Sequence, residues 1–439
     1  MTGAGSASLD LTRLTHRLRS GALTASALIE DVLARIEAAG DDRVWIARVP
    51  AGLLRAQAAS LDAMAARDAG VIARQPLFGI PFAVKDNIDV AGLPTTAACP
   101  AFAYRPAATA PVVARLERAG AVLIGKINLD QFATGLVGCR SPYGVPRNPF
   151  DARFIPGGSS SGSAVAVASG LVSFALGTDT AGSGRVPAAL NNIVGLKPSR
   201  GHLSSRGVVP ACRSLDCVSI FALSCEDAAQ ILDICGGYDA EDPFSRQVPM
   251  QPAAFPERFR FAVPAEADLE FLGDVEAPRL LFAAAVALAG LGGVRVMTEF
   301  APFRAAGAML YEGRWVAERL VAIEELYRRS PEALLPVTRR IIAAGERYSA
   351  TDVFRAEHRL AALRRAAEAV WRSIDLLLLP TAATTYAIAA IEADPIVLNA
   401  RLGHYTNFVN LLDLAAIAVP AGFRADRLPF GISLIAPAG

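Results

Sequence analysis

Residues 155–200 are the part of the sequence best suited to chemistry, because glycine and serine are denser there than an ordinary core needs. The segment reads IPGGSSSGSAVAVASGLVSFALGTDTAGSGRVPAALNNIVGLKPSR. Glycine lets backbone N–H groups approach a ligand closely. A phosphate-binding loop would need G-x-x-x-x-G-K-[ST] or G-x-G-x-x-G, and neither fits. A flexible linker would not be followed at once by an apolar helix, which we expect at 164–168, and a strand. These exclusions leave a serine nucleophile with an oxyanion site.

A serine hydroxyl needs a base within hydrogen-bond reach, and Lys85 is the best candidate. The chain has four histidines, of which only His202 is near this segment. Lys85 lies in GIPFAVKDNIDV, where an apolar strand would carry its ammonium into the interior. Desolvation favours the neutral amine that a base requires. Taken alone, a lysine such as Lys85 would more often be a snorkelling or ion-paired residue at a strand end.

Three blocks of the sequence resemble the amidase signature family: GGSSSGS at 157–163, GTDTAGSGRVPAA at 177–189 and GLKPSRG at 195–201. Members of that family use a Ser–cis-Ser–Lys triad. Position by position, the resemblance implies Ser183 as nucleophile, Ser159 as the serine after a cis peptide bond and Lys85 as base. Neutral Lys85 would take a proton from Ser159, which takes one from Ser183 as it attacks a carbonyl carbon.

The turn around the nucleophile would supply the oxyanion hole. Its donors would be the backbone N–H groups of Thr180, Ala181, Gly182 and Ser183, in a tight turn that glycine makes possible. Preorganised donors of this kind stabilise the negative charge of a tetrahedral intermediate.

Three neighbouring side chains are expected to support the site without reacting. Ser160 would hydrogen-bond behind the triad, and Asp179 with Arg185 would hold the loop. The sequence departs from the commonest family pattern at Ser161, where many members have glycine, and around the nucleophile at Ala181 and Gly184. These departures remove no catalytic group.

Further segments resemble the allophanate hydrolases within that family: SLDCVSIFA at 214–222, LYEGRWVAERL at 310–320 and LGHYTNFVNLLDLAAIAVPAG at 402–422. The resemblance implies hydrolysis of allophanate (urea-1-carboxylate) to ammonia and carbon dioxide through an N-carboxylated intermediate. Such enzymes commonly carry a further C-terminal domain. This sequence ends directly after an expected strand, which suggests that it was cut from a longer protein.

A small anionic ureido substrate needs a fixed cation, and Arg319 could bind its carboxylate while Tyr311 bonds the ureido end. Eight residues on one helix would place the two on roughly the same face. Gly135 and Gly138 of GLVGC would line the pocket through their backbones. Alternatively, Arg319 pairs with a carboxylate from elsewhere in the chain, and Tyr311 is an ordinary core residue.

Apolar, β-rich runs alternate with helical patterns around these residues. The alternation, together with the resemblance, predicts an α/β amidase-signature fold whose large mixed central β-sheet is covered by helices on both faces. We expect strands at 82–86, 121–125, 173–178, 219–224, 374–381, 415–422 and 430–437, and helices at 24–40, 110–119, near Asn128, at 164–168 and, buried, at 280–294.

The whole chain, 1–439, is expected to form one amidase domain of four parts. These are an N-terminal helical segment (1–60), a catalytic core (61–237), a mostly helical substrate-binding subdomain (about 238–370) and C-terminal strands that complete the sheet (371–439).

Composition favours a small-molecule enzyme. The 43 Lys and Arg residues against 42 Asp and Glu residues give no field that would attract nucleic acid or an anionic membrane. The N-terminus lacks a signal-peptide pattern, so we expect a cytoplasmic protein. The apolar stretch at 280–294 is shorter than the roughly 20 residues that span a bilayer. Six scattered cysteines and four histidines argue against a metal site, and we expect no cofactor.

Three alternatives remain open at this point. The chain could be an amidase for another small amide, or the amidotransferase subunit that supplies ammonia for glutaminyl-tRNA or asparaginyl-tRNA formation. A scaffold protein that lost activity would lack a catalytic position, and none is missing. Family members often form homodimers, so a homodimer is expected here.

Overall fold

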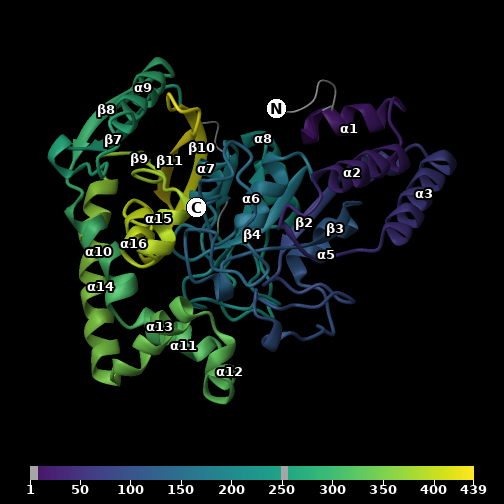
Figure 1. Ribbon diagram of the computed structural model, residues 1–439. Coiled ribbons are helices and arrows are strands. Elements are labelled where there is room, and N and C mark those ends of the chain that lie inside the picture. The colour runs from purple at the N-terminus through teal and green to yellow at the C-terminus, as the bar shows by residue number, and fades with distance from the viewer. Residues whose placement is uncertain (1–7, 249–255) are drawn as a thin grey trace.

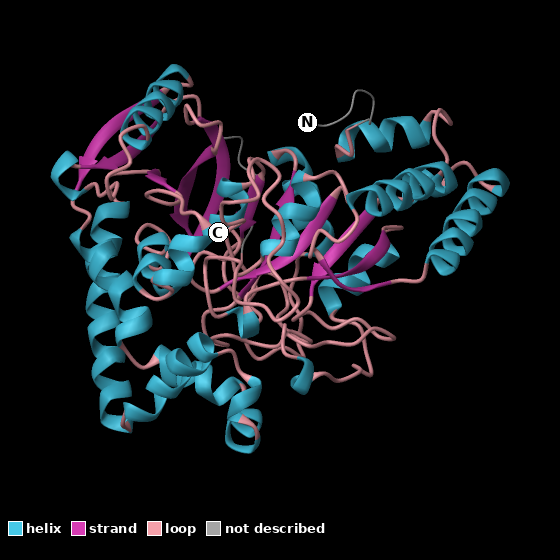
Figure 2. Ribbon diagram, in the orientation of Figure 1, coloured by secondary structure: helices cyan, strands magenta, loops and turns pink. Residues whose placement is uncertain are grey.

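A single mixed sheet of 11 strands runs through the computed structural model, which describes residues 8–248 and 256–439. Its strand order is β1-β3-β2-β4-β6-β5-β10-β11-β9-β7-β8 (Figures 1 and 2). Strand β2 pairs in parallel with β3 and β4, and β7 pairs in parallel with β8 and β9, whereas the end pair β1–β3 and the pairs in the middle of the sheet are antiparallel. This arrangement confirms the predicted α/β class and mixed sheet. The strands are β1 (Trp45–Arg48), β2 (Pro81–Lys85), β3 (Val122–Ile127), β4 (Phe174–Asp179), β5 (Val194–Lys197), β6 (Cys217–Ala222), β7 (Phe259–Pro264), β8 (Gly293–Thr298), β9 (Leu376–Pro380), β10 (Leu414–Phe423) and β11 (Pro429–Pro437).

Helices pack against the sheet and extend beyond it at both ends. Figure 1 shows α1 to α3 gathered at the N-terminal end, and α10 with α14 side by side at the other. The helices are α1 (Leu11–Arg19), α2 (Ala25–Ala39), α3 (Ala51–Arg67), α4 (Val71–Arg74), α5 (Pro111–Arg118), α6 (Ser161–Ala168), α7 (Val186–Leu190), α8 (Cys225–Cys235), α9 (Ala277–Gly290), α10 (Ala301–Glu312), α11 (Trp315–Ala322), α12 (Glu324–Arg329), α13 (Pro336–Ala343), α14 (Ala350–Trp371), α15 (Ile388–Ala393), α16 (Val397–Leu402) and α17 (Phe408–Leu411).

Helix α2 shows how local sequence sets an element. Thr24 caps its N-terminus by accepting a hydrogen bond from the Ala27 N–H, and Gly40 ends it with a positive φ of 62°. The apolar face predicted from the helical period is buried, including Leu28 and Val32. The helix is thereby fixed against the core.

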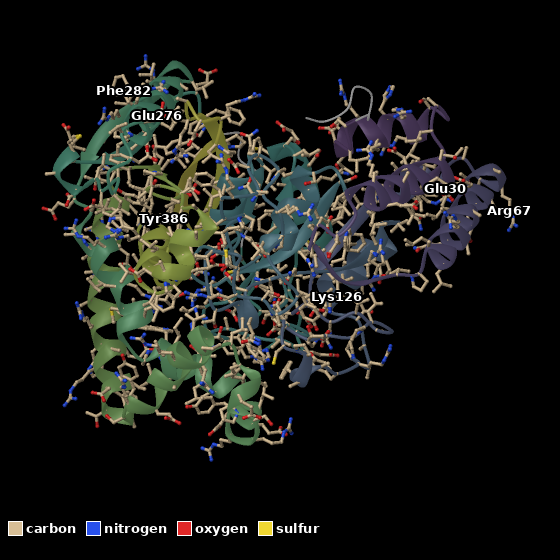
Figure 3. All side chains as sticks on the ribbon, viewed as in Figure 1. Glu30, Arg67, Lys126, Glu276, Phe282 and Tyr386 are labelled. Atoms are coloured by element: carbon tan, nitrogen blue, oxygen red, sulfur yellow. The ribbon has the colours of Figure 1, made fainter. Side chains whose placement is uncertain are left out.

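Two local expectations are wrong. The helix near Asn128 is a short 3-10 turn (Gln131–Ala133), because Phe132 and Ala133 adopt positive φ angles of 50° and 51°. The stretch at 280–294 is not one buried helix: α9 ends at Gly290, and β8 begins at Gly293. Phe282 on α9 is 62% exposed and lies at the periphery in Figure 3.

The segment at 238–370 contributes more than helices. It contains β7 and β8, which pair in parallel and form the last two strands of the sheet. Across the two ranges that the structure describes, no helix is both long enough and apolar enough to cross a membrane.

Candidate active site

Strand β2 ends at Lys85, whose side chain is fully buried. Its Nζ lies 2.7 Å from Ser159 Oγ, 3.0 Å from Ser160 Oγ and 2.7 Å from Thr178 Oγ1. The contact with Thr178 follows from topology, because β2 and β4 are parallel neighbours whose carboxyl ends meet at one edge. The two serines come from the loop that precedes α6. The sheet therefore brings together three segments that are far apart in the sequence.

Burial gives Lys85 the properties of a base. Desolvation lowers the pKa of Lys85 from 10.5 to about 7, although the nearby charges of Asp130, Asp216 and Asp179 act to raise it. A substantial fraction of the amine is then neutral near neutral pH. The neutral amine can accept a proton from either neighbouring serine hydroxyl.

The loop that carries Ser159 is packed tightly on Asp130. The peptide bond between Gly158 and Ser159 is cis, as the resemblance implied. The Asp130 N–H donates to the Ser159 carbonyl oxygen at 3.0 Å. A Cβ added at Gly158 would collide with the Asp130 carboxylate, so this position admits only glycine.

The turn after β4 holds four consecutive free backbone donors. The N–H groups of Thr180, Ala181, Gly182 and Ser183 donate no hydrogen bond to any residue that the structure describes. Buried N–H groups are almost always paired, so four free ones in a row indicate a site for an oxyanion. They are the same four residues whose N–H groups the sequence analysis named as oxyanion donors, and that role stays a prediction.

Asp179 and Arg185 hold this turn in place. Asp179 accepts hydrogen bonds from the Gly184 N–H at 2.9 Å and from Arg185 Nε and Nη2 at 2.9 and 3.0 Å. Both side chains are fully buried. Burial alone would raise the pKa of Asp179, but the Arg185 guanidinium outweighs it and holds that pKa below its ordinary value. The pair is therefore ionised and committed to structure.

Ser183 follows directly on this turn and is 2% exposed. Its hydroxyl makes no hydrogen bond within residues 8–248 and 256–439. The structure thus joins Lys85 to Ser159 directly, while the step from Ser159 to Ser183 belongs to the proposal below.

Arg319 and Tyr311 meet, but not in the way that their spacing suggested. They lie on two helices, because α10 ends at Glu312 and Gly313 is extended before α11 begins at Trp315. Arg319 Cζ nevertheless lies 5.4 Å from the centroid of the Tyr311 ring, within range of a cation–π contact. The predicted pair is close in space, although the expected single helix is wrong.

Arg319 is a buried cation with spare donors. It is 2% exposed, and its Nη1 donates to Thr134 Oγ1 at 3.2 Å. Its Nε and Nη2 have no acceptor, and no ion pair involves it among the residues described. A carboxylate from elsewhere in the chain, the alternative partner, is therefore not seen there. An anionic ligand would satisfy these donors.

The backbone N–H groups of Gly135 and Gly138 differ in whether they have a hydrogen-bond acceptor. The Gly138 N–H donates to Asp130 Oδ2 at 3.0 Å, and the Arg140 N–H donates to Asp130 Oδ1 at 2.8 Å. The Gly135 N–H has no acceptor in the described part of the chain. Of the two glycines, only Gly135 has an N–H group free to meet a ligand.

Sequence reasoning missed several residues that organise this site, namely Thr134, Thr178 and the buried carboxylates Asp130 and Asp216. Asp130 follows β3 as Asp86 follows β2, at the same edge of the sheet. Polar residues directly after a buried strand were the available signal. Thr134 and Asp216 gave none, because their partners lie far away in the sequence.

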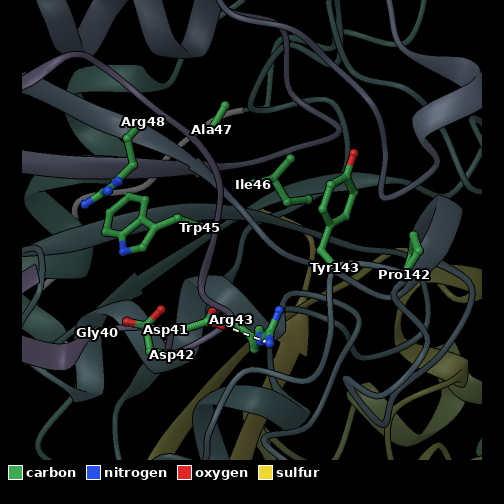
Figure 4. Close-up of a pocket in the computed structure, with 10 residues that line it drawn as sticks. All are labelled: Gly40, Asp41, Asp42, Arg43, Trp45, Ile46, Ala47, Arg48, Pro142 and Tyr143. Atoms are coloured by element: carbon green, nitrogen blue, oxygen red, sulfur yellow. Dashed lines mark ion pairs between the residues drawn. The ribbon is translucent and has the colours of Figure 1, made fainter.

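A separate hollow of about 560 Å³ lies beside the edge strand β1. Figure 4 shows that Trp45, Arg48 and Tyr143 help to line it, and that Arg43 is ion-paired with Asp41 at 2.8 Å. None of the triad residues lines this hollow.

Comparisons with known proteins agree with the geometry. A family model described as Amidase matches residues 27–439. The urea amidolyase of Lachancea kluyveri is 46% identical over 404 residues, which is 91% of this chain and 22% of that protein. The chain thus spans about a fifth of the length of that relative.

Two further similarities cover nearly the whole chain. A solved structure of Kluyveromyces lactis allophanate hydrolase has a TM-score of 0.90 and 42% sequence identity, covering 99% of this chain and 70% of that one. One subunit of the glutamyl-tRNA(Gln) amidotransferase of Prochlorococcus marinus is 33% identical over 98% of this chain and 93% of that protein.

Proposed function

The chain belongs to the amidase family and is a hydrolase of amide C–N bonds, and from that premise we propose that its substrate is allophanate. Ser183 is the nucleophile, Ser159 the proton relay and Lys85 the base. The observation that carries the substrate assignment is the buried Arg319 guanidinium, whose Nε and Nη2 lack an acceptor in the described chain. The similarity to a protein named allophanate hydrolase supports it.

The reaction proceeds through an acyl-enzyme. Neutral Lys85 takes the Ser159 proton and Ser159 takes the Ser183 proton, while Ser183 Oγ bonds to the terminal carbonyl carbon of allophanate. The free N–H groups of Thr180 to Ser183 stabilise the oxyanion. When the C–N bond breaks, the relay returns a proton to the leaving nitrogen, and ammonia departs.

Water then hydrolyses the acyl-enzyme by the same relay. The product is an N-carboxylated carbamate, which takes up two protons, loses two molecules of carbon dioxide and gives a second ammonia.

The anion site explains the choice among amides. A buried guanidinium with unmatched donors is unfavourable until an anion binds, and a carboxylate accepts two parallel hydrogen bonds from it. In this proposal the Tyr311 hydroxyl bonds the ureido end, and the closeness of the Tyr311 ring to Arg319 supports that role. A neutral amide would leave the guanidinium unsatisfied.

A substrate panel tests the proposal: allophanate, malonamate, biuret, a neutral amide and glutamine, with the chain alone. Wild-type protein should turn over allophanate and not glutamine. The Arg319→Ala variant should raise KM for both anionic substrates by about 10- to 100-fold, as expected for lost charge-assisted hydrogen bonds. Arg314→Ala is the matched control, because Arg314 is ion-paired with Glu357 and stacked on Trp315.

Two outcomes would contradict the assignment. Robust glutamine turnover without allophanate turnover would identify the chain as an amidotransferase-like protein. Unchanged kinetic constants for Arg319→Ala would remove the role given to that residue.

The setting of the enzyme is part of the same proposal. We place it in the cytoplasm as a homodimer, with the 238–370 segment as its substrate-binding part, since Tyr311 and Arg319 lie there. The balance of 43 basic and 42 acidic residues supports a small-molecule substrate over nucleic acid. Sedimentation velocity of the purified chain tests the dimer.

A further inference from the structure

The turn at 211–216 lies against the helix that carries Arg319. Cys212 Sγ donates to the Trp315 carbonyl oxygen at 3.3 Å. Glu318 accepts from the Ser214 N–H at 2.7 Å and from Ser214 Oγ at 2.6 Å. Trp315 and Glu318 both belong to α11. The position of α11 is therefore fixed by this turn.

The other end of the same turn is bonded to the oxyanion site. Asp216 Oδ1 accepts a short hydrogen bond from Thr180 Oγ1, and Thr180 is the first of the four residues with free N–H groups. Asn410 Nδ2 adds a second link, since it donates to the Leu215 carbonyl oxygen at 3.0 Å and to that of Asp179 at 2.8 Å. The turn thus connects the anion site to the oxyanion site.

Asp216 also holds its own turn together. Its Oδ2 accepts from the Ala211 N–H at 2.8 Å, and its Oδ1 accepts from the Cys212 N–H at 3.2 Å. One carboxylate therefore fixes the turn backbone and Thr180 at the same time. Loss of Oδ1 would loosen both, because Oδ1 accepts from Thr180 as well as from the Cys212 N–H.

We propose that Asp216 is a positioning residue of the hydrolysis, which aligns the oxyanion donors through Thr180 and ties them to the anion-binding helix α11. The inference rests on the proposed function, because it concerns the same site. It gives Asp216 no contact with the reacting atoms. Its effect on the position of the oxyanion donors therefore passes through Thr180.

The charge of Asp216 acts as well as its geometry. The ionisable groups that face it are Arg319, Lys85 and the thiols of Cys212 and Cys217. Burial raises the pKa of Asp216 to about 6, against the hydrogen bonds from Thr180 and the turn amides. Above that pH, the carboxylate acts to raise the pKa of Lys85. Removing the charge should lower that pKa.

A double-mutant cycle of Asp216→Asn and Thr180→Val tests the inference. Each single variant should lower kcat by about 10- to 100-fold, as expected for a small misplacement of catalytic groups, with little change in KM. The double variant should resemble the single ones, because both changes break one link. Additive losses in kcat, or an unchanged kcat for Asp216→Asn, would overturn the inference.

The pH dependence separates positioning from a merely structural role. In Asp216→Asn, the acid limb of kcat/KM should move to lower pH, since Lys85 loses a negative neighbour. A limb that stays in place would overturn the inference. Asp227→Asn is the matched control: Asp227 is fully buried and accepts from the Leu11 N–H at 3.1 Å, away from the triad. The Asp227→Asn variant should have a lower melting temperature, but its kcat and the acid limb of its kcat/KM profile should stay unchanged.

The experiments distinguish a failure of the substrate assignment from a failure of the role proposed for Asp216. If wild-type protein hydrolyses a neutral amide and not allophanate, the substrate assignment fails. The cycle can then be measured on that amide, because the oxyanion hole serves every amide. The same outcomes decide the role of Asp216 in either case.

Discussion

The role of base that we propose for Lys85 depends on where strand β2 ends. A lysine in water is protonated near neutral pH, and an ammonium cannot accept a proton. In this protein the side chain is fully buried against the hydroxyls of Ser159, Ser160 and Thr178, without an ion-pair partner among the residues described. Hydroxyl groups bond the neutral amine as well as the ammonium, so they do not restore the lost hydration.

The pH profile of kcat/KM should report this base. The pKa of Lys85 is lowered to about 7, so activity should rise with pH through about 7 as the amine loses its proton. Lys85→Arg should be inactive across the range, with a loss of at least about 100-fold, because a guanidinium does not deprotonate. Steady-state rates from acidic to mildly alkaline pH provide the measurement. An acid limb retained by Lys85→Arg would contradict the assignment.

Thr134 provides a second test at the scale of one residue. It is the only described residue to which Arg319 donates a hydrogen bond, at 3.2 Å. Thr134→Val keeps the shape but removes this acceptor, so the guanidinium should lose its fixed direction. We expect KM for allophanate to rise by about 3- to 10-fold, the size of one typical hydrogen bond of about 1 kcal/mol, because Arg319 keeps its charge, and KM for a neutral amide to stay constant.

Thr338→Val is the control for that variant. Thr338 is also a fully buried threonine, on α13, and its hydroxyl has no partner in the described chain. It should leave both KM values unchanged. Equal effects on anionic and neutral substrates in Thr134→Val would show that Thr134 serves general packing.

The turn after β4 is the element on which the oxyanion site depends. Gly182 has a φ of 146°, and a Cβ there would collide with the Thr406 side chain. Gly182→Ala should therefore displace the free N–H groups and lower kcat by about 100-fold or more, the effect of losing one oxyanion donor. Gly92→Ala is the control, since Gly92 also has a positive φ of 87° but an added Cβ meets nothing within 4 Å. Steady-state kinetics and melting temperatures of both variants test this prediction. A similar loss of kcat in both variants would contradict it.

At this scale the sequence predicted much of the sheet. The strands β2, β3, β4, β6, β9, β10 and β11 were found from their apolar runs, because both faces of most are covered. By contrast, β8 alternates between half-buried and exposed residues, and β5 has only four residues. Neither produces an apolar run of useful length. The periodicity of apolar residues does not predict the order of the strands in the sheet, because that order depends on strands far away in the chain.

The site was predicted unevenly for the same reason. Ser183, Ser159 and Lys85 stand in local patterns that a sequence displays. Asp216 does not, because its function depends on Thr180, 36 residues earlier. Arg319 and Tyr311 were paired through an assumed single helix, and the break at Gly313 shows that they meet through the packing of α10 on α11 instead.

The whole molecule has only three lysines, Lys85, Lys126 and Lys197, and all are fully buried. Burial lowers the pKa of each of them. Lys126 is ion-paired with Asp86 at 3.3 Å, whereas Lys85 bonds only to hydroxyls among the residues described. Burial of the Lys85 amine without an ion-pair partner among the described residues lowers the stability of the fold at every pH where that amine must be charged.

The stability of the whole fold should therefore depend on pH through Lys85. The unfolded lysine holds its proton up to about 10.5 and the folded one up to about 7, so unfolding takes up a proton between these values. Raising the pH within this window then stabilises the wild type by up to about 1.4 kcal/mol per pH unit. Lys85→Met lacks this contribution, so its free energy of unfolding relative to the wild type should fall as the pH rises through this window.

Urea denaturation of both proteins at several pH values within the window measures this difference. The comparison cancels the other titrating groups, including Lys197, because both chains share them. The substitution also removes the hydrogen bonds between Lys85 and the hydroxyls, which changes the difference by a similar amount at every pH. The slope of the difference against pH, and not its size, therefore carries the test. A difference that stays constant across the window would mean that Lys85 keeps its proton in the folded state, and that it is not the base.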